Sequence, residues 1–117
     1  MKLAWLNPRL EGCCVSGAHL RATIGAQAEA AEDLLHLVSQ APRLENLATF
    51  RSVRLDVDAG NLTLSIEEVD MYAQPLSPGG VPGALATPAS LAEHALAQAL
   101  LIRDLCVQGQ SILRLAS

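Results

Sequence analysis

The segments Val53-Arg54-Leu55-Asp56-Val57 and Leu62-Thr63-Leu64-Ser65-Ile66 alternate apolar and polar residues, and Asp58-Ala59-Gly60-Asn61 separates them. Alternation with a period of two on both sides of a turn predicts a β-hairpin with one buried face. When Val57 is placed opposite Leu62, all six apolar side chains share that face. A slip of one residue would place half of them on the wrong side. The pattern therefore predicts the register as well as the hairpin.

The size and composition of the chain predict a single domain over residues 1–117. A chain of 12.3 kDa buries roughly two-thirds of its unfolded surface, which is enough for one modest core. Hydrophobic residues make up 50% of the sequence but aromatic residues only 3%, so the core is expected to consist of Leu, Ala and Val. A net charge of −4 and few aromatic rings argue against a nucleic-acid partner.

The cysteine count and the hydropathy pattern predict a cytoplasmic protein with no membrane partner. The chain has three cysteines, an odd number that does not suit a secreted disulfide framework. Its apolar stretches are shorter than the 18 or so residues of a membrane helix.

Helical spacing predicts a first long helix over 18–40, ended by Pro42. A short turn is expected from Arg43 to Leu47. The apolar seam of this helix, with one polar member, consists of Leu20, Ile24, Gln27, Ala31, Leu34 and Val38.

The second strand of the hairpin is expected to run to about Tyr72. The alternation breaks at Glu67-Glu68, which indicates a bulge or a sheet end that is buried on both faces. A further strand is possible from Lys2 to Leu6. Residues 73–86 are rich in Pro and Gly and are expected to form a long loop, which is either a mobile segment or a partner-binding arm.

A second long helix is predicted from Thr87-Pro88 or Ser90 to Leu115, because Ser90 and Glu93 have the spacing of a capping box. Between Ala95 and Ile102 its only polar residue is Gln98, and a helix that is apolar on nearly all sides is buried on nearly all sides. Its interface seam is expected to be Leu91, Ala95, Gln98, Ile102, Leu105 and Ile112, widened by Leu101 and Leu113.

These elements predict an α+β fold in which two long helices pack on one face of a central antiparallel hairpin, in the order α-β-β-α. A lone hairpin leaves two unpaired strand edges, and the second helix has more apolar surface than its own chain can cover. Both features favour a homodimer, associated helix against helix or edge against edge.

Two acidic patterns resemble metal sites, and neither predicts one. Asp56, Asp58 and Glu67 have the first, third and twelfth positions of a calcium loop, but the flanks alternate as strands and Gly60 occupies a ligand position. Glu29, Glu32, Asp33 and His36 share one helix face, where a solvated acidic surface is the simpler explanation. No metal or other cofactor is expected.

Other candidate polar groups also have a structural interpretation. Gln27 and Gln98 each lie on an apolar seam, where they could pair with each other, or line a pocket between helices and sheet together with His36 and His94. His19 has no assigned role, and Cys13-Cys14 is more simply a buried pair than a reactive one.

The function that these features favour is non-catalytic. A small acidic chain with surplus apolar surface and no catalytic signature is expected to be a protein-interaction module: an adaptor, a chaperone-like protein or an inhibitor. Its partners would be a second copy and another protein. The alternative is a small-molecule-binding protein or minor enzyme that uses the pocket described above.

Overall fold

The computed structural model describes residues 1–58, 60–83 and 93–115. Its strands are β1 (Lys2–Trp5), β2 (Arg54–Asp58), β3 (Asn61–Ile66), β4 (Val69–Pro75), β5 (Ala99–Val107) and β6 (Gln110–Ser111). Its helices are α1 (Pro8–Cys14), α2 (Gly17–Ile24), α3 (Ala28–Gln40) and α5 (Ile112–Leu115), with the 3-10 helices η1 (Gly25–Gln27) and η2 (Leu44–Thr49).

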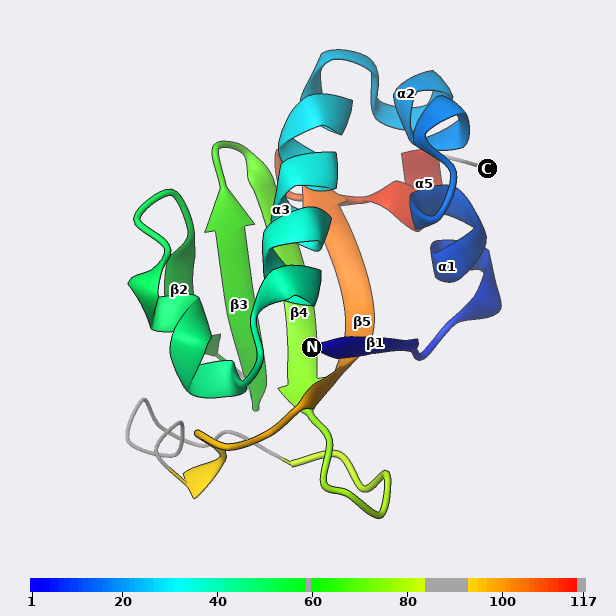
Figure 1. Ribbon diagram of the computed structural model, residues 1–117. Coiled ribbons are helices and arrows are strands. Elements are labelled where there is room, and N and C mark those ends of the chain that lie inside the picture. Colours follow the sequence, from blue (N-terminus) through cyan, green and yellow to red (C-terminus); the bar gives the residue numbers. More distant parts are fainter. Residues whose placement is uncertain (59, 84–92, 116–117) are drawn as a thin grey trace.

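The strands form one six-stranded sheet in the order β1-β5-β4-β3-β2, with β6 paired to β5 (Figure 1). Strands β1 and β5 run parallel, and every other pair is antiparallel. The mixed α+β class is confirmed, but the sheet has more strands than the predicted hairpin. None of the helices described is long and apolar enough to cross a membrane.

The hairpin has the predicted register, with Val57 opposite Leu62 and Leu55 opposite Leu64. The strand expected near the N-terminus is also present, as β1. The bulge expected at Glu67-Glu68 is wrong. These residues form a tight turn that leads into β4, and Glu67 has a left-handed φ of 52° there.

The first predicted helix is two helices. Gly25 adopts a φ of 59°, which interrupts the helical backbone between α2 and α3. The seam still packs inward, because Leu20, Leu34 and Val38 are fully buried. Helix α3 ends at Gln40, two residues before Pro42, as predicted.

The second long helix is wrong where the structure describes it: residues 99–107 form β5, a strand in the interior of the sheet. It pairs with β4 on one side and with β1 on the other, so its backbone groups and its apolar side chains are both covered. A short apolar run bounded on both sides fits such a strand as well as a buried helix. The expected helix start at residues 87–90 lies outside the described residues, and so does Leu91.

The order α-β-β-α is therefore also wrong. The surplus apolar helix that favoured a dimer does not exist in this region, because Ile102 and Leu105 are buried within their own chain. Of the predicted loop, residues 73–75 belong to β4, Leu76 forms an isolated bridge with Pro82, and residues 84–86 lie outside the described residues.

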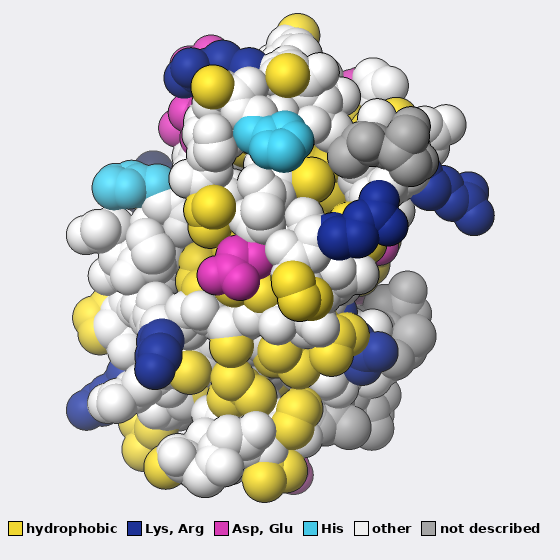
Figure 2. Space-filling view, turned by 90° about the vertical axis from the view of Figure 1, so that its right-hand side faces the viewer, with side chains coloured by type: hydrophobic (Ala, Val, Ile, Leu, Met, Phe, Trp, Pro, Cys, Tyr) yellow, Lys and Arg dark blue, Asp and Glu magenta, His cyan; other side chains and the backbone are white. Residues whose placement is uncertain are grey.

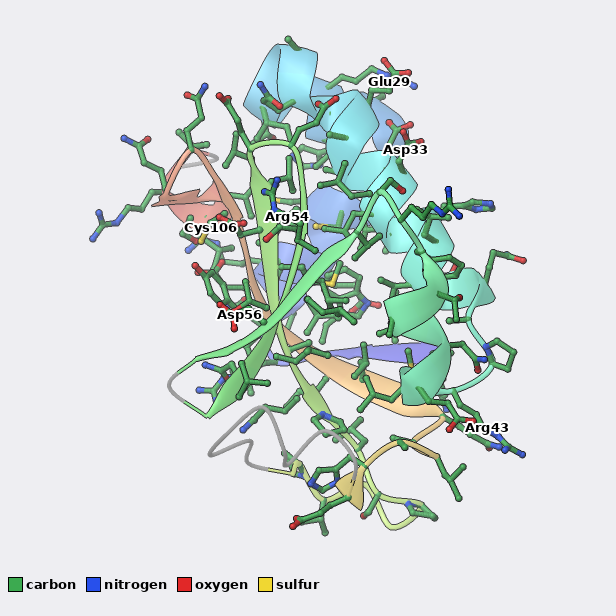
Figure 3. The ribbon with its side chains drawn as sticks, turned by 90° about the vertical axis from the view of Figure 1, so that its left-hand side faces the viewer. Glu29, Asp33, Arg43, Arg54, Asp56 and Cys106 are labelled. Atoms are coloured by element: carbon green, nitrogen blue, oxygen red, sulfur yellow. The ribbon has the colours of Figure 1, made fainter. Side chains whose placement is uncertain are left out.

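Helix α3 crosses in front of β3 and β4, and α1, α2 and α5 lie beside the β5 end of the sheet (Figure 1). The sheet side chains beneath them are fully buried: Leu62, Leu64, Met71, Ala73, Ile102 and Leu105. The opposite side, called the open face below, faces away from α3, and among the described helices only the short α5 lies near it, beside β5 (Figure 3).

Candidate functional site

The open face carries polar residues from four neighbouring strands. The register aligns Arg54, Ser65, Asp70 and Cys106 in one row, and Asp56, Thr63, Tyr72 and Asp104 in the next. Figure 3 shows Asp56 and Cys106 on the side away from α3, whereas Glu29 and Asp33 project from α3 itself. Alternate residues of each strand point to opposite faces of the sheet, so the strands that bury apolar side chains on one face present these polar side chains on the other.

A shallow hollow of about 440 Å³ lies in this face. It is lined by Arg54, Leu55, Asp56, Thr63, Ser65, Asp70 and Tyr72. Two carboxylates and one phenol ring thus border a single depression, which suits a ligand group with both a positive charge and some apolar surface.

The arginines of the face are already engaged with neighbouring acceptors. Arg54 donates from Nη2 to the Glu67 carbonyl oxygen at 2.7 Å. Arg103 donates from Nη1 to Gln74 Oε1 at 3.1 Å. Among the described residues that line the hollow, the charged side chains are Arg54, Asp56 and Asp70, so these three together carry a net negative charge.

Two of the carboxylates are fixed by hydrogen bonds. The Ser65 hydroxyl donates to Asp70 Oδ1. Asp104 Oδ1 accepts from the Ser111 hydroxyl at 2.8 Å and from the Leu105 N–H at 2.8 Å. Asp56, which is exposed, accepts at Oδ1 only from the N–H of Val57 among the hydrogen bonds described, at 2.8 Å.

Cys106 is held in its protonated form. Burial raises the pKa of its thiol to about 12, and the nearby Asp104 and Asp70 carboxylates add to the increase. Its Sγ donates to Asp104 Oδ2 at 3.7 Å, which also favours the neutral thiol. A neutral thiol is a poor nucleophile, so the geometry does not support cysteine chemistry at this face.

One hydroxyl of the hollow has no hydrogen-bond partner among the described residues. Thr63 Oγ1 is buried and unpaired, and Thr63 lines the hollow. A buried hydroxyl without a partner is costly, and a rotation of the Thr63 side chain toward the hollow would allow it to bond to a ligand there.

The polar residues predicted to line a pocket between helices and sheet do not converge. Gln27 Nε2 donates to Glu68 Oε2 at 3.2 Å, so the expected pair with Gln98 is wrong. His36 is exposed on α3, and His94 lies against Gly83. Gln98 is exposed, and its carbonyl accepts from the Lys2 N–H at 3.0 Å.

The predicted interface seam is distributed over several elements. Ile102 and Leu105 belong to β5 and Ile112 to α5, and all three are fully buried in the core of the chain. Ala95 is half-buried just before β5. Leu101 and Leu113, which were expected to widen the seam, are also half-buried.

The two acidic patterns that resemble metal sites have the surroundings that their structural interpretations predicted. Asp56 is in a strand of the hairpin, and Glu29, Asp33 and His36 are exposed on α3. Glu32 pairs with Arg21 at 3.4 Å. Within the described ranges, no group of three or more His, Cys, Asp or Glu side chains is arranged to hold a metal ion.

The surroundings of the two neighbouring cysteines and of His19 indicate structural roles. Cys13 and Cys14 are buried in the core, and burial, with Cys13 and Asp104 nearby, raises the pKa of Cys14 to about 12. His19 is exposed in the first turn of α2, where its N–H donates to Ser16 Oγ at 3.3 Å.

Sequence reasoning did not single out Asp70, Tyr72 or Asp104. Extending the period of two along residues 69–75 would have added Asp70 and Tyr72 to the polar face, since Val69, Met71 and Ala73 alternate with them. Asp104 could not be found this way because its segment was interpreted as a helix. No family model, curated protein sequence or solved structure matches the chain.

Proposed function

We propose that this chain is a non-catalytic protein-interaction module that binds a segment of another protein across the open face of its sheet. The observation that carries this proposal is the hollow lined by Asp56, Asp70 and Tyr72 on the face of the sheet away from α3. The role fits an adaptor, a chaperone-like protein or an inhibitor acting in the cytoplasm.

The chemistry of the hollow favours a partner segment with a basic side chain. Asp56 and Asp70 supply negative charge, and the phenol ring of Tyr72 offers a surface for the aliphatic part of an arginine or a lysine. The net charge of −4 favours encounter with a basic partner over a distance.

Photo-crosslinking from the open face tests the proposal. A photoreactive phenylalanine analogue replaces Tyr72, and a matched variant carries the same group at His36, which is exposed on α3. We expect position 72 to crosslink one recurrent protein in living cells and position 36 to crosslink none. In cell extracts, the yield of the crosslinked product should fall as the salt concentration rises from about 0.15 M to about 1 M. At about 1 M, salt screens the attraction between charges that are more than about 3 Å apart.

Equal labelling from both positions, or no labelling from position 72, would contradict a docking role for the open face. Far-UV circular dichroism of both variants establishes that each is folded before crosslinking.

A small polar molecule in the same hollow is the second candidate, favoured by the unpaired Thr63 hydroxyl. A thermal-shift screen of polar metabolites tests it, because a ligand that binds only the folded chain raises its melting temperature. Replacement of Thr63 by Val should abolish any such shift.

A further inference from the structure

The outer edge of β2 is complementary to the same edge of a second copy. β2 is the last strand in the sheet order, and no strand of the described residues pairs with its outer side. Such an edge presents a row of N–H and C=O groups to another strand. We propose that two copies of the chain associate through this edge, with their β2 strands antiparallel about a two-fold axis at Leu55.

The backbone of β2 has the right groups on its outer side. The N–H of Val57 donates to Asp56 Oδ1 at 2.8 Å, so it does not point to β3. Because alternate residues of an antiparallel strand direct both backbone groups to the same side, those of Leu55 and the carbonyl of Val53 also point outward. The N–H of Val53 is engaged within the chain, since it donates to the Phe50 carbonyl at 3.2 Å.

A two-fold axis at Leu55 brings each of these outward N–H groups opposite a carbonyl of the second copy. The Leu55 N–H donates to the Leu55 carbonyl of the second copy, and the Val57 N–H donates to the Val53 carbonyl of the second copy. Symmetry repeats each bond once. Asp56 then releases the Val57 N–H and becomes free to accept from another donor.

The side chains select the same register. Arg54 comes to lie opposite Asp56 of the second copy, and symmetry repeats this pair, so two opposite charges meet twice on the open face. Both residues are exposed in the single chain. One N–H of Arg54 stays on the Glu67 carbonyl, and the guanidinium has further donors for the carboxylate.

The other registers with the same backbone directions are less favourable. An axis at Val57 would place Arg54 opposite Gly60 of the turn, so the two pairs of opposite charges would be lost. An axis at Val53 would place Arg54 opposite Ser52 and would pair fewer strand residues. With the axis at Leu55, the half-buried Leu55 and Val57 also meet apolar partners on the covered face.

The opposite edge of the sheet, β1, lacks this complementarity, and hydrophobic side chains gather in the lower half of the molecular face on its side (Figure 2). Its sequence is Lys-Leu-Ala-Trp, so Lys2 has no acidic residue to face in a two-fold pairing. β1 therefore provides a matched control for charge changes at β2.

The dimer joins the two sheets with both open faces on the same side, because its axis is perpendicular to the sheet. The dimer would then present two copies of the hollow side by side, and in each of them Asp56 is paired with Arg54 of the other copy, so Asp70 is the carboxylate left for a basic ligand group. This inference does not rest on the proposed function, since the edge can pair whether or not the open face binds a protein.

Light scattering over a dilution series measures the solution mass of the wild type and of four variants. These are Arg54→Asp, Asp56→Arg, the double variant R54D/D56R, and the control Lys2→Asp. We expect the wild type to have twice the chain mass of 12.3 kDa at micromolar concentration. Each single change at β2 should weaken the dimer about tenfold, because two attractive cross-strand pairs become repulsive.

The double variant should recover most of the lost affinity, since it restores both opposite-charge pairs with their signs exchanged. Lys2→Asp should dimerise like the wild type. A wild-type chain that stays at 12.3 kDa, or a double variant weaker than both single ones, would overturn the proposal. Light scattering tests the dimer, whereas crosslinking from position 72 tests the proposed function. A negative result in one experiment therefore does not decide the other.

Discussion

The two faces of the sheet come from the same strands and have opposite surroundings. On the covered face, Leu62, Leu64 and Met71 are fully buried beneath the helices. On the open face, their chain neighbours Thr63 and Tyr72 border a polar hollow. Alternation therefore lets one strand contribute stability through one residue and a binding surface through the next.

The largest effect is expected when two adjacent residues, one on each face, are replaced in separate variants. Leu64→Ala removes a fully buried side chain and should lower the free energy of unfolding by about 2–5 kcal/mol. Thr63→Val keeps the shape and removes an unpaired hydroxyl, so it should change stability by less than about 0.5 kcal/mol. Urea unfolding of both variants measures the two changes. Comparable losses would mean that the two faces are not distinct.

Thiol ionisation extends the comparison to alkaline pH. Burial raises the pKa of Cys14 and Cys106 from 9.0 to about 12 in the folded chain. The unfolded chain therefore releases protons between pH 9 and 12 that the folded chain retains, so stability falls as pH rises through this window. Below about pH 9 the effect is absent.

Urea unfolding at several pH values checks this effect, with a C14A/C106A variant as the control. The variant should lose stability less steeply than the wild type above pH 9. Parallel curves would show that the two thiols ionise alike in the folded and unfolded chains.

A smaller effect is expected where turns and helices meet at the end of the sheet. Glu68 Oε2 accepts from Gln27 Nε2 at 3.2 Å and from Gln108 Nε2 at 2.6 Å, and so connects three segments at the surface. Glu68→Ala should lower the free energy of unfolding by about 1 kcal/mol. Glu68→Gln keeps an acceptor oxygen and should cost less. If Glu68→Gln costs as much as Glu68→Ala, these hydrogen bonds do not account for the loss.

The smallest effect is expected at the ion pair between Arg21 and Glu32. The N–O distance is 3.4 Å, but the arginine side chain is 67% exposed. Arg21→Ala should therefore cost less than about 0.5 kcal/mol, and added salt should remove the difference. A loss that persists in high salt would show that Arg21 acts through packing instead.

Local sequence patterns predicted the elements in which apolar residues recur with one constant spacing. The hairpin register followed from alternation, and the end of α3 followed from Pro42. The interruption at Gly25 could not be predicted, because one glycine in a helical pattern is often tolerated. Residues 99–107 could not be assigned either, since their apolar character comes from burial between β4 and β1, which is a tertiary property.

The candidate site was predicted only in part, for the same reason. The alternation that places six apolar residues of the hairpin on one face also implies that Arg54, Asp56, Thr63 and Ser65 share the other. Asp104 joined them only through the pairing of β5 with β4. The histidines and glutamines chosen from helical seams lie apart, because one of the two predicted seams does not exist.

The distinction between the two faces depends on β5 lying in the interior of the sheet. Nuclear Overhauser contacts between backbone protons in solution test this placement most directly. We predict contacts between Val69 and Val107 and between Leu3 and Leu100, which are register partners on the two sides of β5. Contacts between residues three apart within 99–107, with none across to β4 or β1, would indicate a helix and contradict the account.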